Sequence, residues 1–178
     1  MRESHPGTCP ACGSEIRIVH HRLDIPPHFP DLLLVSIACD ACGYRHTDTI
    51  ILGGEGIPVR WTVRVEEPGD LAIRVARSTT GKIEIPELGL AVEPGAACEG
   101  FVTNIEGGIL YRFEQAVETV LADPESEDER AAALRMMETI AAAREVAFPF
   151  TVTLEDPAGN SALVSEKAEK VLFDPGDA

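Results

Sequence analysis

Two short cysteine motifs constrain this chain more than any other feature of its sequence. The segments 9–12 and 39–42 each have the pattern C-x-x-C, each is followed at once by a glycine, and 26 residues separate them. Two turns that each present two thiolates can complete a tetrahedral shell of four sulfurs around one zinc ion. Four protein ligands leave no open coordination position, so the zinc is expected to be structural. The predicted ligands are Cys9, Cys12, Cys39 and Cys42.

Other roles for these cysteines are less well supported by the pattern. A single C-x-x-C motif can be a redox dithiol, but two motifs with matching flanks argue against that role. Disulfides require an oxidising compartment, of which the sequence has no sign. An iron–sulfur cluster also uses four cysteines, though usually at other spacings. The interval between the motifs is longer than in most zinc ribbons, so the connecting segment is expected to carry structure of its own. The fifth cysteine, Cys98, is expected to be a buried core residue.

Length, composition and charge limit the class of protein. The chain has 178 residues, 44% of them hydrophobic, which suffices for one ordinary domain and a small zinc module. No segment resembles a signal peptide or reaches the roughly 18 apolar residues of a membrane span, so we expect a cytoplasmic protein. The formal net charge is −15. Such a field repels phosphate backbones and makes nucleic acid an unfavourable main ligand; it fits either a solvated acidic surface or a basic partner.

The cysteine motifs predict a zinc ribbon over residues 1–56. Strands are expected to run into and out of the motifs, over residues 16–20, 32–38 and 47–52. The segment 24–31 contains three prolines, which exclude regular structure, and a stiff loop is expected there.

Residues 57–178 predict a β domain. Short runs of alternating apolar and polar residues recur about every ten residues, with glycine and proline between them, which is typical of an all-β sandwich or barrel. Strands are expected over residues 59–65, 71–75, 83–92, 98–105, 148–154, 162–164 and 171–173. Asp156–Gly159 has the sequence of a type I turn, and Glu106–Gly108 is expected to end a strand.

A helical hairpin is expected to interrupt the β domain at about residues 112–146. One helix is predicted by apolar residues at helical spacing: Phe113, Ala116, Val117, Val120 and Leu121. Ser126 and Glu129 form the sequence of a capping box at the start of the second helix. That helix is expected to bury one side, formed by Ala132, Met136, Ile140 and Ala143. The segment 123–129 between the helices holds five acids and no base, so the tip is strongly negative.

Catalytic motifs are absent from the sequence. It lacks a G-x-S-x-G elbow, a phosphate-binding loop and a dinucleotide fingerprint. Residues 57–178 contain no histidine, which removes the usual metal site of enzymatic β barrels of the cupin kind, so we do not expect an enzyme. Four histidines crowd the zinc module, where surface or packing roles are favoured over a second metal: His20, His21, His28 and His46. Three loops rich in glycine and small polar residues could bind a ligand or serve as tight connections: 77–81, 104–108 and 156–161.

Several motifs, taken together, resemble those of the ZPR-type zinc finger proteins, in the single-module archaeal form. They are CPAC…IPPHFPDLLL…CDACGYRHTD, RSTTGKIEIPELG, EGFVTNIEGGI and LEDPAGNSALV, which occur in the family's order over nearly the whole chain. The resemblance implies a zinc ribbon followed by a double-stranded β-helix-like domain with an inserted helical hairpin. It carries zinc ligation over to Cys9, Cys12, Cys39 and Cys42. It also implies a protein partner, a homologue of translation elongation factor 1-alpha, whose folding eukaryotic members are thought to assist.

The alternative function is that of a nucleic-acid-associated zinc ribbon protein of transcription or translation. In that case Arg17, Arg22 and Arg45 would have to form the contact surface. The net charge counts against this hypothesis.

Overall fold

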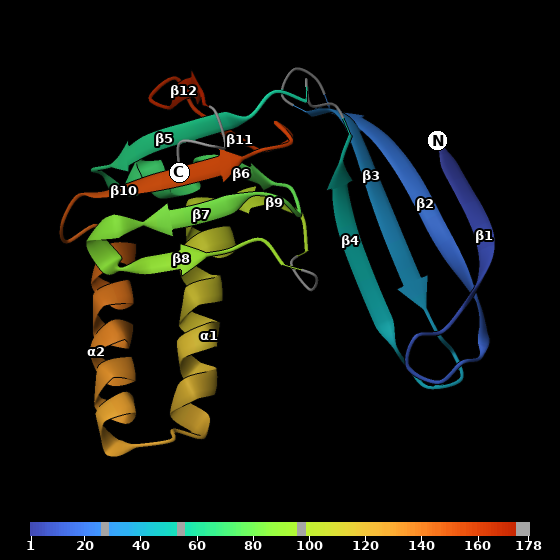
Figure 1. Ribbon diagram of the computed structural model, residues 1–178, viewed down its shortest axis with the longest axis horizontal. Helices are drawn as coiled ribbons and strands as arrows, with labels where there is room; N and C mark the ends of the chain where they lie inside the picture. Colours follow the sequence, from blue (N-terminus) through green and yellow to red (C-terminus); the bar gives the residue numbers. More distant parts are fainter. Residues whose placement is uncertain (26–28, 53–55, 96–98, 174–178) are drawn as a thin grey trace.

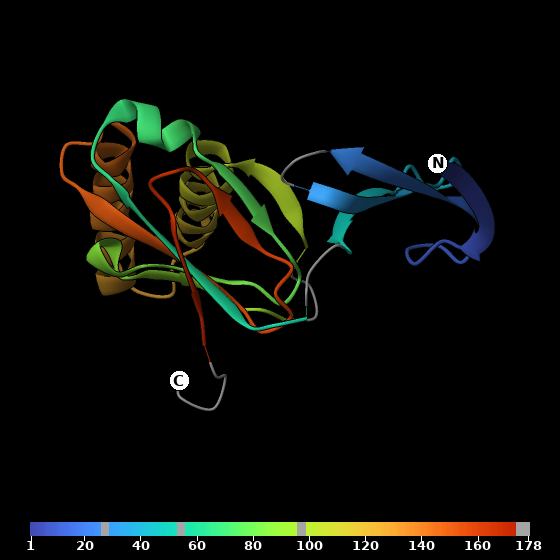
Figure 2. The ribbon, with the colours of Figure 1, turned by 90° about the horizontal axis from the view of Figure 1, so that it is seen from above.

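The structure is a computed structural model that describes residues 1–25, 29–52, 56–95 and 99–173. It has an N-terminal four-stranded sheet and a larger β domain that carries two helices (Figures 1 and 2). The architecture is therefore mainly β with one helical hairpin, as expected. Cys98, expected to be buried, lies outside the described residues, and so does His28.

The N-terminal sheet consists of two β-hairpins side by side, in the antiparallel order β1-β2-β3-β4. The strands are β1 (Arg2–Thr8), β2 (Glu15–Ile25), β3 (Phe29–Ala38) and β4 (Arg45–Ile51). The three expected strands are present, but β1 was not predicted. The loop expected over residues 24–31 is wrong in extent, because 24–25 belong to β2 and 29–31 to β3. Pro30 falls where the register shifts and β3 has one residue more than β2, and a proline is tolerated at such a bulge.

The β domain has two sheets that share one hydrophobic core. One has the strand order β12-β5-β10-β7-β8 and the other the order β11-β6-β9. The bounds are β5 (Val59–Val65), β6 (Arg74–Arg77), β7 (Lys82–Ile85), β8 (Leu90–Val92), β9 (Phe101–Asn104), β10 (Phe150–Asp156), β11 (Ala162–Val164) and β12 (Glu169–Leu172). Alternate residues of the central strand β10 are buried, as a strand with one face on the core requires. Side chains of both sheets meet in the core, among them Val63, Val75, Ile83, Phe150 and Leu163.

Two short helical turns replace parts of the predicted strands. The helix η1 (Pro68–Ala72) contains Leu71, which was expected in a strand, and η2 (Pro86–Leu88) separates β7 from β8. In both, a proline at the start fixes a helical φ, and this outweighs the apolar alternation around it.

The helical hairpin consists of α1 (Tyr111–Ala122) and α2 (Glu127–Arg144), preceded without a break by the π-helical turn η3 (Glu106–Leu110). Glu106–Gly108 therefore begins a helix and does not end a strand. Ser126 caps α2 as expected, since its Oγ accepts a hydrogen bond of 3.1 Å from the amide of Glu129.

The expected buried faces of these helices are only partly correct. Phe113 is buried and Val117 half-buried, but Ala116 and Val120 are exposed. In α2 the buried residues are Ala133, Ile140 and Ala143, whereas Ala132 is exposed. Figure 1 shows the reason: the hairpin projects away from the sheets, so only its near end packs on the core.

A small contact joins the two parts at one end of the N-terminal sheet. Leu32 and Ala76 are buried there, with half-buried apolar side chains around them. Asp48 Oδ1 accepts a hydrogen bond of 3.2 Å from the amide of Gly100 on the other part. The cysteine-containing turns lie at the opposite end of the sheet (Figure 1), so they are remote from this junction.

Candidate metal centre

The two cysteine motifs form turns with the same backbone conformation. Gly13 donates a hydrogen bond of 2.9 Å to the carbonyl of Cys9, and Gly43 donates one of 2.9 Å to the carbonyl of Cys39. Both glycines have φ of +75°, a conformation that costs other residues energy. The sequence feature that marks each motif, a glycine directly after the second cysteine, is thus required by the turn.

The four sulfurs lie close enough together to share one ion. All four Sγ atoms are within 4.8 Å of one another, and the pairs Cys9–Cys42 and Cys12–Cys39 are 3.7 Å apart. A tetrahedral zinc–thiolate site with bonds of about 2.3 Å separates its sulfurs by about 3.8 Å. The residues present therefore fit one structural zinc ion with no open coordination position.

The pKa values of Cys12 and Cys42 reflect how close the four sulfurs lie. Hydrogen bonds from the side chain and backbone of Ser14 lower the pKa of Cys12 to about 6. The backbone amide of Tyr44 also lowers the pKa of Cys42, but the neighbouring thiols and desolvation outweigh it and raise that pKa to about 12. Thiolates this close repel one another, and a divalent cation among them removes the repulsion.

The metal centre has its own small apolar shell. Cys9 and Cys39 are buried with Ile16, and the half-buried side chains of Ile18, Ile37 and Tyr44 pack against them.

The remaining described potential ligands of this sheet do not form a second metal site. Among the described residues, the four cysteines are the one group of three or more Cys, His, Asp or Glu side chains close enough to hold a metal. His5 and His20 contact each other, with ring centroids 5.0 Å apart, and His46 pairs with Glu99.

Comparison with known protein families covers both parts of the chain. Residues 3–57 match the ZPR1 zinc-finger domain, and residues 69–174 match the ZPR1 jelly-roll domain. The chain belongs to the ZPR1 family.

Relatives in the ZPR1 family include archaeal proteins of similar length. A ZPR1-like protein of Pyrococcus horikoshii is 41% identical over 95% of this chain and 77% of its own length. Another, from Methanocaldococcus jannaschii, is 35% identical over 93% of this chain and 83% of its own. The zinc finger chaperone zpr1 of Schizosaccharomyces pombe is 34% identical over 88% of this chain, which spans about a third, 34%, of that longer protein. The family resemblance and the structural zinc predicted from the sequence are therefore confirmed, and the β domain, expected to be double-stranded β-helix-like, matches a jelly-roll domain.

Two of the three polar loops of this ZPR1 family member meet at one buried carboxylate. Asp156 is fully buried and accepts five hydrogen bonds. They come from the hydroxyls of Ser78 (2.6 Å), Thr80 (2.7 Å) and Ser161 (2.6 Å) and the amides of Ala158 (2.9 Å) and Asn160 (3.1 Å). All five hydrogen bonds to Asp156 come from residues of loops 77–81 and 156–161. These two loops therefore hold the two sheets together. The turn predicted at Asp156–Gly159 is present, with a 3.1 Å hydrogen bond from the amide of Gly159 to the carbonyl of Asp156.

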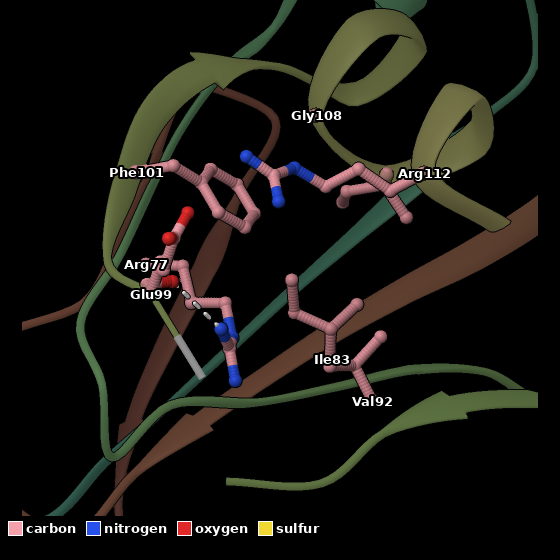
Figure 3. A pocket seen from close by; sticks show the side chains of 8 residues that line it. Arg77, Ile83, Val92, Glu99, Phe101, Gly108 and Arg112 are labelled. Carbon is pink, nitrogen blue, oxygen red and sulfur yellow. Dashed lines mark hydrogen bonds between the residues drawn. The ribbon is translucent and has the colours of Figure 1, made fainter. Parts of the chain in front are cut away.

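A cavity of about 210 Å³ opens in the jelly-roll domain beside β9 (Figure 3). The guanidinium of Arg112 lies over the ring of Phe101, 4.6 Å from its centroid, and that of Arg77 lies 5.9 Å from it. Arg77 is buried and donates hydrogen bonds to the carbonyls of Gly81 and Glu99. The described residues that line this cavity do not include a set of nucleophile, acid and base. The relative from Schizosaccharomyces pombe is named a zinc finger chaperone.

The three arginines considered for nucleic-acid contact do not form one surface. The strand register places Arg17 and Arg45 on the same face of the N-terminal sheet, on either side of Ala38. Arg22 points to the opposite face and pairs with Asp31, with Nε 2.5 Å from Oδ1. Sequence reasoning missed Arg2, because β1 was not predicted, and it therefore missed that Arg2 and His21 share the face of Arg17.

Membrane insertion by a helix has no support in the described part of the chain, where no helix is long and apolar enough to span a bilayer.

Proposed function

We propose that this protein binds, and assists the folding of, a GTPase of the translation elongation factor 1-alpha type. The observation that carries the proposal is the match to the zinc finger chaperone of Schizosaccharomyces pombe, which runs through both the zinc ribbon and the jelly-roll domain. The absence of a catalytic set among the described residues around the jelly-roll cavity supports a binding role. The site of action is the cytoplasm.

In this proposal Cys9, Cys12, Cys39 and Cys42 ligate one zinc ion, which holds the ribbon in shape and takes no part in chemistry. The chain divides into the ribbon over residues 1–56 and the β domain over residues 57–178. The acidic field supports a partner with basic surface: residues 58–178 hold 23 acidic and 11 basic side chains.

Affinity purification from native lysate tests the partner. Tagged protein is expected to enrich the elongation factor over an unrelated acidic protein of the same size, with enrichment that falls as salt is raised. A second assay dilutes the denatured, purified GTPase into buffer with or without this protein and measures recovered guanine-nucleotide binding. Lack of enrichment at every salt and nucleotide condition, together with unchanged recovery, would refute the proposed function.

A further inference from the structure

One face of the ribbon sheet carries cations in a regular arrangement. The register aligns Pro6, Arg17, Ala38 and Arg45 in one row across the four strands. Neighbouring strands are about 4.8 Å apart, so the backbones of Arg17 and Arg45 are about 10 Å apart. Ala38 between them is too short to fill the space. The row therefore has a cation on each side of an open floor.

A second cationic row lies further along the same face. Arg2, His21 and Leu34 are aligned there, four residues along the strand from the first row. At about 3.4 Å per residue, the two rows are about 14 Å apart. The row between them contributes Val19 and Ser36. The face thus has a cationic row at each end and, between them, the apolar side chain of Val19 and the hydroxyl of Ser36.

The cations of this face make no ion pair within the described residues. Arg17 is held in place by Ser4, since its Nε donates a hydrogen bond of 2.8 Å to Ser4 Oγ, and neither Arg2 nor Arg45 lies within ion-pair distance of a described carboxylate. Several basic side chains of the jelly-roll domain behave differently. Arg60, Arg64, Lys82, Arg144 and Lys167 each pair with one or two carboxylates. In a chain of net charge −15, cations left without such pairs on one face make a site for an anionic ligand.

The surface between the rows is hollowed. A shallow cavity of about 300 Å³ is lined by Arg2, Arg17, Val19, His21, Leu34, Ser36 and Ala38. Its floor is apolar in part, because Val19 and Leu34 are half-buried and contribute to it. An apolar floor between two cationic rows fits a ligand with acidic groups at its ends and a small apolar group in the middle.

We propose that this face, formed by Arg2, Arg17, His21 and Arg45, binds an extended acidic segment of the partner polypeptide. In an extended chain, alternate side chains point the same way and are about 6.7 Å apart. Acidic side chains at positions i and i+4 therefore reach the two cationic rows, and an apolar side chain at i+2 meets Val19 and Leu34. The inference rests on the proposed function, because it names the surface by which the partner is held.

The observations favour a polypeptide over nucleic acid. A single strand of nucleic acid is usually bound by stacking of bases on aromatic side chains, and the residues lining this cavity include none apart from His21. A long phosphate backbone would also extend past the ribbon into the negative field of the rest of the chain. A short acidic segment with an apolar anchor avoids both problems.

The test measures binding of a fluorescent peptide of sequence Glu-Ser-Leu-Ser-Glu, which has glutamate at positions i and i+4 and leucine at i+2. Fluorescence anisotropy is recorded with the full chain and with the double variant Arg17→Gln/Arg45→Gln. The matched control is Arg130→Gln/Arg135→Gln, which removes two exposed arginines from α2. The first variant is expected to bind about tenfold more weakly than wild type, and the control to bind as wild type does. Zinc content and Trp61 emission confirm that each variant is folded.

The outcomes separate this inference from the proposed function. Equal binding by the two double variants overturns the inference, as does tighter binding of a single-stranded oligonucleotide or of a lysine-substituted peptide. If wild type and Arg17→Gln/Arg45→Gln enrich the elongation factor equally, the inference fails and the proposed function stands. If the peptide binds in an arginine-dependent manner but no elongation factor is enriched, the proposed function fails and the acidic-peptide site stands.

Discussion

Replacement of Asp156 by asparagine should destabilise the jelly-roll domain severely, although the two side chains have the same shape. The Oδ1 atom of Asp156 accepts from Thr80 Oγ1 and the amide of Ala158, and Oδ2 accepts from two hydroxyls and the amide of Asn160. An asparagine has one oxygen, so in either orientation its NH₂ group faces a backbone N–H. Hydroxyls can rotate to accept, but a backbone amide cannot.

The magnitude follows from this count. An unsatisfied buried donor costs about 1–3 kcal/mol, and the remaining hydrogen bonds lose the strengthening that a charged acceptor gives them. The expected loss of unfolding free energy is about 3–5 kcal/mol, a large part of the roughly 5–15 kcal/mol of a typical domain. The assay is denaturant unfolding followed by the emission of Trp61. This is the single tryptophan of the chain, and it lies in β5, so it reports on the jelly-roll domain alone.

The control is Glu155→Gln, the same chemical change at the next residue of β10. Glu155 pairs with Arg60 on the outer face, where an ion pair contributes about 0–1 kcal/mol. If Asp156→Asn and Glu155→Gln both unfold within about 1 kcal/mol of wild type, the account of Asp156 as a buried acceptor of five hydrogen bonds is wrong.

Acid should remove the stability that the ionised carboxylate of Asp156 contributes. Burial alone raises the pKa of Asp156, but the hydrogen bonds from Ser161, Ser78 and Thr80 outweigh it and hold that pKa below its usual value. A carboxyl with a lower pKa in the folded state stabilises above its unfolded pKa, about 3.9, and loses this effect as pH falls through the folded value. The difference between wild type and Asp156→Asn should therefore be complete at pH 7 and shrink below about pH 4.

Three further changes test other parts of the structure. Cys39→Ala should lose the zinc and unfold the ribbon while the unfolding transition followed by Trp61 persists, because structural zinc contributes about 10–16 kcal/mol to a small module. A full equivalent of zinc in this variant by elemental analysis would contradict this. Ser126→Ala removes the 3.1 Å cap of α2 and should lower the unfolding free energy by about 1 kcal/mol, and no change in the denaturant midpoint would argue against the cap. Gly108→Ala places a Cβ 2.0 Å from Cγ2 of Thr103 and should lower the unfolding free energy by about 1–3 kcal/mol. The double variant with Thr103→Ser should recover part of this loss, and additive effects of the two changes would rule out the clash.

The elements that the sequence predicted well are those with a strong local signal. The glycine after each C-x-x-C is a local signal that lets the backbone fold back, and the structure has φ of +75° at both positions. The alternation in β5 and β10 survives because each strand packs one face on the core. The N-cap of α2 is likewise a local signal, and Ser126 accepts from the amide of Glu129 as expected. The reciprocal half of the capping box is not formed, because Glu129 Oε2 accepts from the amide of Glu125 instead of that of Ser126.

The elements that were missed depend on distant partners. Strand β1 has almost no apolar side chain and forms because β2 offers it a free edge. The role of Asp156 could not be assigned from a turn sequence alone, since Ser78 and Thr80 reach it from a loop far away in the chain. The basic face required the register of four strands, which no local pattern gives.

The zinc and the open face of the ribbon are connected by the same physical constraint. A four-stranded sheet normally becomes stable by packing one face against a second layer. Among the described side chains of this ribbon, the cluster around the cysteines has three buried residues, Cys9, Ile16 and Cys39, and the junction at the other end adds Leu32. These side chains alone cannot offset the cost of ordering about fifty residues. Because the metal supplies that stability at one end and the jelly-roll domain supplies it at the other, no second layer is needed, and the face with Arg17 and Arg45 stays accessible for a partner.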